Sequence, residues 1–299
     1  MSQSWKGIFA IVLTPFKEDG ELDEEDLRRL VRFTIEAGAS GLVGPANASE
    51  FSTLSDAERR RWLEVAIGEA AGQVPVVAAI TSGHARPAIE LGRFAQDLGA
   101  GGVMAMPPPI LPLNAEGCYR YFEALAVALS IPICIQNFNA PAGTPMSADL
   151  LARMCRELPN VEYIKEETAP EPRQVGATLR AAGSDCKGVM GGQGGIYLLD
   201  EHRRGTVGNM PGCHTTDVLV DIWNLLERGE RDRARKHFNQ LLPLMMYERL
   251  YGVAVYKEIM HRRGVIKSTQ RRAPGSPLDE ADRLELEEIL KGVEPLFRI

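Results

Sequence analysis

The sequence predicts an α/β fold, a (β/α)8 TIM barrel with a C-terminal helical extension, and three observations support this prediction. Eight short apolar segments alternate with helical patterns along the first two thirds of the chain. The segments are continuously apolar, which is typical of parallel strands covered on both faces. The glycine-rich stretch 191–195 lacks the spacing of GxGxxG or a P-loop, so a doubly wound nucleotide-binding sheet is the weaker alternative.

The expected strands are rich in β-branched and other apolar residues and end near glycine or proline. In chain order they are IFAIVLT (8–14), SGLVG (40–44), VPVVAAI (74–80), GGVMAM (101–106), IPICIQN (131–137), VEYIKEE (161–167), KGVMG (187–191) and GTVGNM (205–210). Glycine at the joins supplies the left-handed turn that ends the preceding helix.

Helical periods fill the intervals between these strands. Apolar residues recur at i, i+3, i+4 and i+7 in 27–35 and in 118–129, as on the buried face of a helix. The segment Ser55–Glu58, SDAE, is a capping box that opens the next helix. After about residue 212 the chain is helical, with interruptions expected near Pro243 and Gly252. We therefore expect a barrel in residues 1–228 and a helical subdomain, residues 229–299, packed on it.

Composition narrows the class of partner. The net charge of −6 gives no reason to expect nucleic acid or an anionic membrane as a partner. No apolar run reaches the roughly 18 residues that span a bilayer, and the N-terminus lacks a leader pattern. Five scattered cysteines indicate a reduced, cytoplasmic protein. The five histidines show no metal-binding spacing, so we expect neither a metal nor another cofactor.

Lys165 lies at the carboxyl end of the sixth expected strand, in NVEYIKEET. Catalytic groups of a TIM barrel gather at this end of the strands. A buried lysine that is forced into the neutral form is a nucleophile that forms a Schiff base with a carbonyl substrate. Two other interpretations remain open from the residues alone, namely an ion pair with Glu166 or Glu167 and a phosphate-binding lysine.

Five motifs together resemble the dihydrodipicolinate synthase / N-acetylneuraminate lyase family of Schiff-base enzymes. They are GIFAIVLTPF, GPANASEFSTLSDAER, AMPP, IQNFNAPAGT and VEYIKEET. The resemblance implies that Lys165 forms the imine and that the protein is a homo-oligomer, a tetramer. It also implies that the substrate carboxylate is bound after the second strand, by backbone N–H groups of Asn47, Ala48 and Ser49 with help from the Asn47 amide or the Ser49 hydroxyl.

The chain departs from the family at the residue that transfers protons. The family's fifth-strand tyrosine is replaced by Gln136, which cannot act as an acid or base. Candidates for that role are Glu166, Thr168, Ser49, a water held by Gln136 and Asn137, and the substrate's own carboxylate. The family's arginine for a second carboxylate is absent from NAPAGTP, so we expect no dihydrodipicolinate synthesis.

Further motifs resemble the L-2-keto-3-deoxyarabonate dehydratase branch of the family, namely ANASEF, VMAMPP, YIKEET, PLMMYER and RGVIKSTQRRAP. This resemblance implies a lyase that dehydrates a 2-keto-3-deoxy sugar acid, so the expected partner is a small-molecule 2-oxo acid. The alternatives are a pyruvate-releasing aldolase, a cyclic imino acid deaminase and a 2-oxo-acid-binding protein without turnover. Gly191 and Gly192, ending the seventh strand, either allow close substrate approach or serve only as turn residues.

Overall fold

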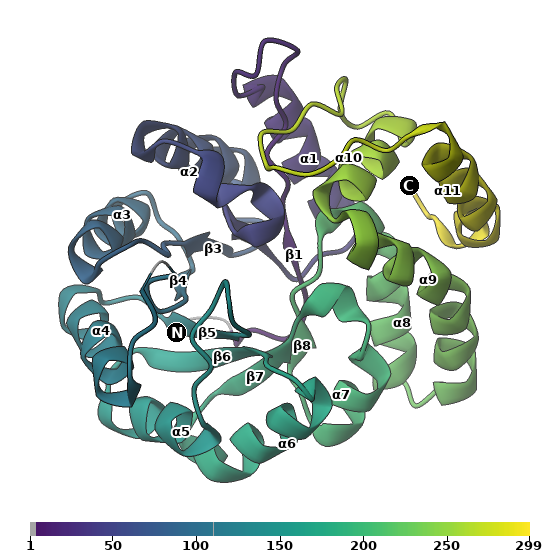
Figure 1. Cartoon of the computed structure of the whole chain (residues 1–299). Helices are drawn as coiled ribbons and strands as arrows, with labels where there is room; N and C mark the ends of the chain where they lie inside the picture. The colour runs from purple at the N-terminus through teal and green to yellow at the C-terminus, as the bar shows by residue number, and fades with distance from the viewer. Residues whose placement is uncertain (1–3, 110) are drawn as a thin grey trace. The chain divides into compact units, whose positions relative to one another are not determined.

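The computed structural model describes residues 4–109 and 111–299 (Figure 1). Eight parallel strands follow the chain order β1 to β8 in one closed barrel, which confirms the predicted TIM barrel with its C-terminal helical extension. Residues 1–3 and Ile110 lie outside the described residues. Packing divides the chain into two compact units, residues 1–6, 75–193 and 197–210, and residues 7–74, 194–196 and 211–299. The division into 1–228 and 229–299 stays a prediction.

The first unit contains six strands and the five helices that connect them. Its strands are β3 (Val76–Ala79), β4 (Gly102–Ala105), β5 (Ile133–Phe138), β6 (Val161–Glu167), β7 (Gly188–Gly191) and β8 (Gly208–Asn209). Its helices are α3 (Ala85–Asp97), α4 (Ala115–Ala128), α5 (Ala148–Glu157), α6 (Glu171–Ala182) and α7 (Leu198–Arg204). Every residue of β3, β4 and β7 is buried, which explains why these strands read as continuous apolar runs.

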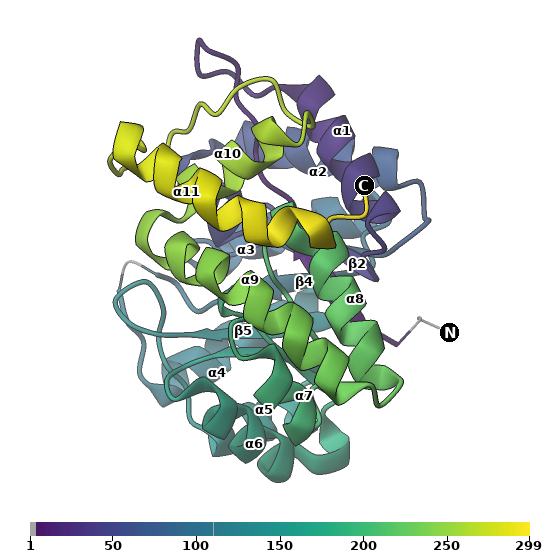
Figure 2. The same ribbon diagram turned by 90° about the vertical axis from the view of Figure 1, so that its right-hand side faces the viewer.

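The second unit contains two strands and six helices. They are β1 (Gly7–Ile11), β2 (Gly41–Gly44), α1 (Glu24–Glu36), α2 (Asp56–Ala70), α8 (Thr216–Glu227), α9 (Arg231–Tyr251), α10 (Val253–Arg262) and α11 (Glu280–Val293). Two short 3-10 turns, η1 (Asn47–Ser49) and η2 (Phe51–Thr53), follow β2. The predicted capping box is present at the start of α2. Figure 2 shows α11 lying along α9, and the two helices pack together.

Two expected elements differ from the structure. Helix α9 runs through Pro243 without a break and ends only before Gly252, because buried residues on both sides of the proline, Leu241 and Leu244, hold it against its neighbours. Strand β8 is shorter than residues 205–210, because Gly205 takes a left-handed conformation to cap α7. No helix in the described part of the chain is long and apolar enough to cross a membrane.

Candidate active site

The pairing of β5 with β6 sorts the candidate residues onto two faces of the sheet. Gln136 is in register with Lys165, and Asn137 is in register with Glu166. Side chains alternate between the two faces along a strand. Gln136, Lys165 and Glu167 therefore share one face, whereas Asn137 and Glu166 lie on the other.

Lys165 is buried beside a carboxylate, with only 2% of its surface exposed. Its Nζ lies 3.0 Å from Glu167 Oε2, and the same oxygen accepts a 2.7 Å hydrogen bond from Gln136 Nε2. The other oxygen of Glu167 accepts the N–H of Gln193 at 3.0 Å. Such pairing offsets the cost of removing an ammonium from water. A base thus lies within one hydrogen bond of the candidate nucleophile.

Glu167 was not among the predicted site residues, although an ion pair with it was one of the open alternatives. The signal that could have identified it is the strand period of two, because the residue two positions after Lys165 must project from the same face. Its backbone oxygen also accepts a hydrogen bond from Asn139 Nδ2 at 3.0 Å. This contact fixes the end of β6 against the loop after β5.

On the opposite face, three predicted site residues bind one another. Glu166 Oε2 accepts from Asn137 Nδ2 at 2.9 Å, and Glu166 Oε1 accepts from the N–H and Oγ1 of Thr168 at 2.9 and 2.5 Å. Asn137 also exchanges two hydrogen bonds with the backbone of Met146. Burial raises the pKa of Glu166. Among the described contacts none joins this cluster to Lys165, so it holds the two strand ends in place.

Gly191 and Gly192 make room for carboxylates. A Cβ atom on Gly191 would lie 2.0 Å from a carboxylate oxygen of Glu201, and one on Gly192 would lie 2.2 Å from Glu167 Oε1. Any side chain at either position would displace those glutamates. In the structure, the groups that lie close to the two glycines are the carboxylates of Glu201 and Glu167. Close approach of a substrate to Gly191 and Gly192 stays a prediction.

Glu171 and Glu201 form a second buried acidic pair. Glu171, the first residue of α6, accepts the N–H of Gly192 at 3.1 Å. Glu201, on α7, accepts from Asn209 Nδ2 at 2.9 Å and is fully buried. Glu171 Oε2 and Glu201 Oε1 are buried and have no other hydrogen-bond partner among the described residues. Burial is the main cause that raises the pKa of both carboxyls, and each carboxyl also shifts the pKa of the other. The pair therefore holds a proton near neutral pH.

We expect Glu171→Gln to stabilise the protein at alkaline pH. Raised pKa values mean that the folded chain holds more protons than the unfolded one, so stability falls as pH rises above the ordinary value of 4.5. The amide of glutamine still offers an N–H donor to Glu201, and the substitution removes the titrating carboxyl of Glu171. The free energy of unfolding, measured in urea, should exceed that of the wild type by about 1–3 kcal/mol at alkaline pH and show no gain at about pH 5.

Asp200→Asn is the matched control for this experiment. Asp200 lies next to Glu201 on α7 but is paired with Arg204 at the surface. This variant should follow the wild type at both pH values. An unchanged pH dependence of stability in Glu171→Gln would show that the two carboxyls do not share a proton.

The turn η1 contains the residues predicted to bind the substrate carboxylate. Asn47 is exposed, Ala48 is half-buried and Ser49 is buried. Both donors of Ser49 are engaged, because its Oγ donates to Val12 O at 2.6 Å and its N–H donates to Ala46 O at 2.9 Å. For the N–H groups of Asn47 and Ala48, the contacts within the described residues give no acceptor. The N–H groups of these two residues are therefore the backbone donors of this turn that a ligand could use.

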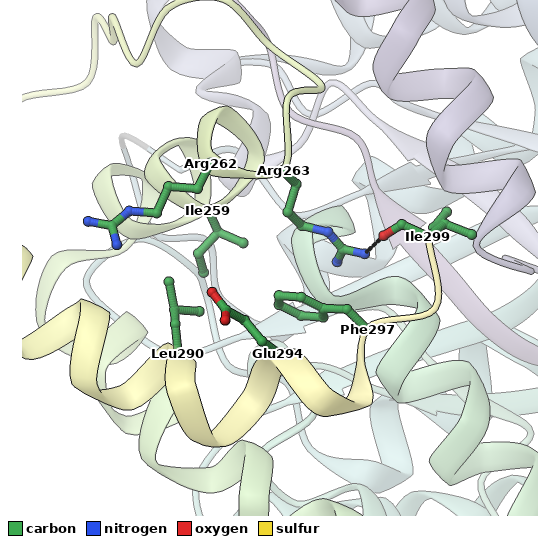
Figure 3. Close-up of a pocket in the computed structure, with 7 residues that line it drawn as sticks. All are labelled: Ile259, Arg262, Arg263, Leu290, Glu294, Phe297 and Ile299. Atoms are coloured by element: carbon green, nitrogen blue, oxygen red, sulfur yellow. Dashed lines mark hydrogen bonds between the residues drawn. The ribbon is translucent and has the colours of Figure 1, made fainter.

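A cavity of about 240 Å³ lies among the C-terminal helices (Figure 3). It is lined by Ile259, Arg262, Arg263, Leu290, Glu294, Phe297 and Ile299. Arg263 pairs with Asp217 at 2.7 Å and donates to the backbone oxygen of Ile299 at 2.6 Å. With that guanidinium engaged and no buried nucleophile on its wall, the cavity lacks the chemistry seen at Lys165. Within residues 4–109 and 111–299 no group of three His, Cys, Asp or Glu side chains could hold a metal ion.

The chain matches the dihydrodipicolinate synthetase family over residues 4–293. It is 35% identical over 298 residues to L-2-keto-3-deoxyarabonate dehydratase of Azospirillum brasilense, covering 97% of this chain and 95% of that protein. It is 30% identical over 292 residues to 4-hydroxy-tetrahydrodipicolinate synthase of Syntrophobacter fumaroxidans, covering 96% and 98%. The crystal structure of YagE from E. coli K12 in complex with pyruvate superimposes with a TM-score of 0.91 at 27% identity, covering 97% and 99%.

Proposed function

Because this chain belongs to the dihydrodipicolinate synthetase family, a family of lyases, we propose that it dehydrates a 2-keto-3-deoxy sugar acid through an imine on Lys165. L-2-Keto-3-deoxyarabonate is the first substrate to test, since a dehydratase of that name is 35% identical to this chain. The observation that carries the proposal is the buried Lys165 with Glu167 at 3.0 Å and Gln136 bound to the same carboxylate oxygen.

The first step is imine formation. The Lys165 ammonium gives a proton to Glu167, and the neutral amine attacks the C2 ketone of the substrate. The ketone oxygen leaves as water, so that a protonated imine joins Nζ to C2. The substrate carboxylate is held by the N–H groups of Asn47 and Ala48 and by the Asn47 amide. Ser49, whose donors are engaged, positions this turn.

The second step is elimination of water. A proton leaves C3 and its electron pair moves to the iminium nitrogen, which gives an enamine. The enamine expels the C4 hydroxyl, which takes a proton and leaves as water. Glu167 is the acid–base group for both transfers, because it is the carboxylate on the face of Lys165. Elimination leaves an iminium conjugated with a C3–C4 double bond. A proton then leaves C5, which carries a hydroxyl, and a proton is added at C3, so that the double bond moves to C4–C5 as an enol. This enol takes a proton at C4 and becomes the C5 aldehyde, and hydrolysis of the imine returns Lys165 and releases the 2-oxo acid semialdehyde.

Glu166, Thr168 and Asn137 have a positioning role in this proposal. Their mutual hydrogen bonds fix the carboxyl ends of β5 and β6. Those ends carry Gln136, Lys165 and Glu167 at hydrogen-bonding distance. Displacement of reacting groups by about 1 Å is enough to cost 10²-fold in rate.

A product assay on a panel of 2-keto-3-deoxy acids tests the proposal. Dehydration yields a 2-oxo acid semialdehyde with the full carbon count of the substrate, whereas retro-aldol cleavage yields pyruvate and an aldehyde. Semialdehyde as the main product is the expected result. Pyruvate as the main product would establish an aldolase, ammonia released from a cyclic imino acid would establish a deaminase, and binding without any product would establish a binding protein.

We expect Gln136→Ala to lower kcat about 10-fold to 100-fold, the scale of one or two positioning hydrogen bonds. Gln136 donates to Glu167 at 2.7 Å but has no titratable group, so its loss misplaces the base without removing it. Gln136→Tyr is the companion variant, and it should not raise the dehydration rate. A several-fold gain in dehydration by Gln136→Tyr would show that the missing tyrosine is a defect and would favour the binding protein.

A further inference from the structure

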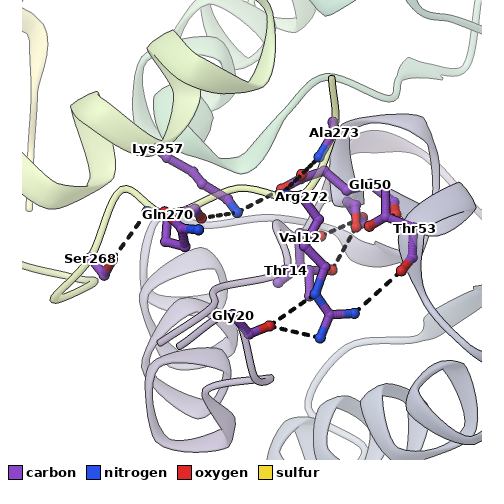
Figure 4. A network of polar contacts seen from close by, with 11 residues as sticks. Val12, Thr14, Gly20, Glu50, Thr53, Lys257, Ser268, Gln270, Arg272 and Ala273 are labelled. Carbon is purple, nitrogen blue, oxygen red and sulfur yellow. Dashed lines mark hydrogen bonds and ion pairs between the residues drawn. The ribbon is translucent and has the colours of Figure 1, made fainter. Parts of the chain in front are cut away.

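Lys257, on α10, is a second fully buried lysine of the chain and is not one of the predicted site residues. Its Nζ lies 2.6 Å from Glu50 Oε1 and donates to the backbone oxygen of Gln270 at 2.7 Å (Figure 4). The ammonium also lies 4.4 Å from the centre of the Phe16 ring. A charge buried this deeply persists only where partners on every side hold it.

Glu50 connects Lys257 to the turn that contains Asn47, Ala48 and Ser49. It follows η1 directly, in a left-handed conformation with φ 56° and ψ 34°. For a residue with a side chain this conformation is unfavourable and is kept only where the surroundings impose it. The second oxygen of Glu50 accepts the backbone N–H groups of Arg272 and Ala273 at 2.8 and 2.6 Å.

Arg272 binds three residues that precede it by more than 200 positions. Its guanidinium donates to the backbone oxygens of Gly20 at 2.7 Å and Thr53 at 3.3 Å (Figure 4). It also pairs with Glu58, in the first turn of α2, at 2.6 Å. The hydrogen bond from Arg272 holds the pKa of Glu58 at about 2. These contacts fix where the backbone N–H groups of residues 272 and 273 lie.

The turn is held from two sides. On one side two hydrogen bonds of 2.6 Å join the turn to the segment that follows β1: Ser49 Oγ donates to Val12 O, and Thr14 Oγ1 donates to Ser49 O. On the other side Glu50 is bound by Lys257 and by the backbone of residues 272 and 273. We propose that Lys257, the Arg272 side chain and the backbone N–H groups of residues 272 and 273 form a clasp on the turn, in which Glu50 and Lys257 are positioning residues for the substrate carboxylate.

This inference rests on the proposed function, in that the turn is taken to bind the carboxylate. If the clasp opens, only a fraction of molecules holds the turn in its binding conformation, and the apparent dissociation constant rises by the inverse of that fraction. The groups that react at C2, C3 and C4 stay in place on β5 and β6. Loss of the clasp should therefore raise the substrate concentration at half-saturation. If Glu50 and Lys257 had a purely structural role, their loss would lower only the free energy of unfolding.

Pyruvate is the probe for the first measurement, with borohydride to trap the imine on Lys165. We expect Glu50→Gln and Lys257→Met each to raise the half-saturating pyruvate concentration about 10-fold, while the trapping rate at saturation stays within about threefold. The double variant should show a smaller increase than the product of the two single ones, because it leaves no unpaired buried charge. Glu50→Asp keeps the negative charge for Lys257 but is one methylene group shorter, so it cannot reach all of the partners of Glu50 without moving the turn. It should therefore also raise the half-saturating pyruvate concentration, although no buried charge loses its counter-charge.

Lys267→Met is the matched control. Lys267 belongs to the same C-terminal segment, but its side chain is 64% exposed and its nearest carboxylate oxygen, on Asp26, is 3.8 Å away. This variant should match the wild type in half-saturation and in trapping rate. Equal half-saturation of Glu50→Gln, Glu50→Asp and the wild type would overturn the clasp.

Backbone hydrogen exchange of the peptide covering residues 46–54 tests the clasp without reference to catalysis. We expect faster exchange of this peptide in Glu50→Gln, Glu50→Asp and Lys257→Met than in the wild type and in Lys267→Met. If wild-type protein traps no pyruvate on Lys165, the proposed function is wrong, and this exchange experiment still decides on the clasp. Exchange that is unchanged in all three variants would contradict the inference.

Discussion

Lys165→Met is expected to abolish imine formation and to lower turnover by on the order of 10⁴-fold or more, since the nucleophile itself is lost. Methionine has a similar length and fills the buried space, but it offers no amine to the C2 carbonyl. In the wild type, borohydride with pyruvate should add the ligand mass to the peptide that contains Lys165. The measurement is mass spectrometry of the trapped protein, together with the turnover of both proteins on the keto acid panel.

Lys187→Met is the control for this variant. Lys187 precedes β7 directly, and its side chain is 51% exposed and paired with Glu162 at 2.7 Å. Its adduct and turnover should equal those of the wild type. An adduct mapped to Lys257 or to any other lysine, or turnover in Lys165→Met above a hundredth of the wild-type value, would exclude Lys165 as the imine-forming residue.

Glu167→Gln should lower kcat by about 10² to 10⁴-fold, the range found when a general acid or base is removed. Glutamine keeps the size of the side chain and an acceptor for Gln136, but it cannot take a proton from the Lys165 ammonium at 3.0 Å or from C3 of the bound substrate. Hydroxide in alkaline buffer can replace the carboxylate as the base in imine formation, so pyruvate should still be trapped there. In this variant the imine should thus still form while the elimination of water is slow. Rapid-mixing kinetics would measure the rates of the two steps separately.

Glu162→Gln is the matched control on the same strand. Glu162 pairs with Lys187 at 2.7 Å and is the second residue of β6, at the end of the strand away from Lys165. Its turnover should stay within about twofold of the wild type. Turnover of Glu167→Gln within tenfold of the wild type, over the whole pH range, would assign the proton transfers to another group, of which Thr168 and a water bound by Gln136 are the first to test.

The barrel and the burial of a lysine at a strand end could be predicted from the sequence because their signals are local; that Lys165 is the nucleophile stays a prediction. A strand covered on both faces must be apolar at consecutive positions, and Val161, Tyr163 and Ile164 meet this condition. A lysine at the end of such a run is conspicuous, since an ammonium avoids burial unless it is needed and paired. The capping box at Ser55 lies within four residues and was found in the same way.

The partner of Lys165 was decided by the tertiary structure. The sequence offers Glu166 and Glu167 side by side, and either could pair with Lys165. The period of two along β6 favours Glu167, but only the folded strand brings Glu167 Oε2 to 3.0 Å from Lys165 Nζ. On the other face, Glu166 is engaged by Asn137 and Thr168 and lies 3.5 Å from Thr178 of α6. The local pattern likewise predicted a helix break at Pro243, and the packing of α9 overrode it.

Contacts between distant segments leave no periodic signal in the sequence. Glu171 and Glu201 are carried by different helices, and only their joint burial makes them share a proton. Glu50 and Lys257 belong to opposite ends of the chain, and each reads as an ordinary surface charge until the fold brings them to 2.6 Å. Apolar patterns thus determined the barrel and the place of Lys165 at a strand end. The folded chain decided which buried charges lie together, Lys165 with Glu167, Glu171 with Glu201, and Glu50 with Lys257, because the cost of desolvation depends on neighbours that only the fold supplies.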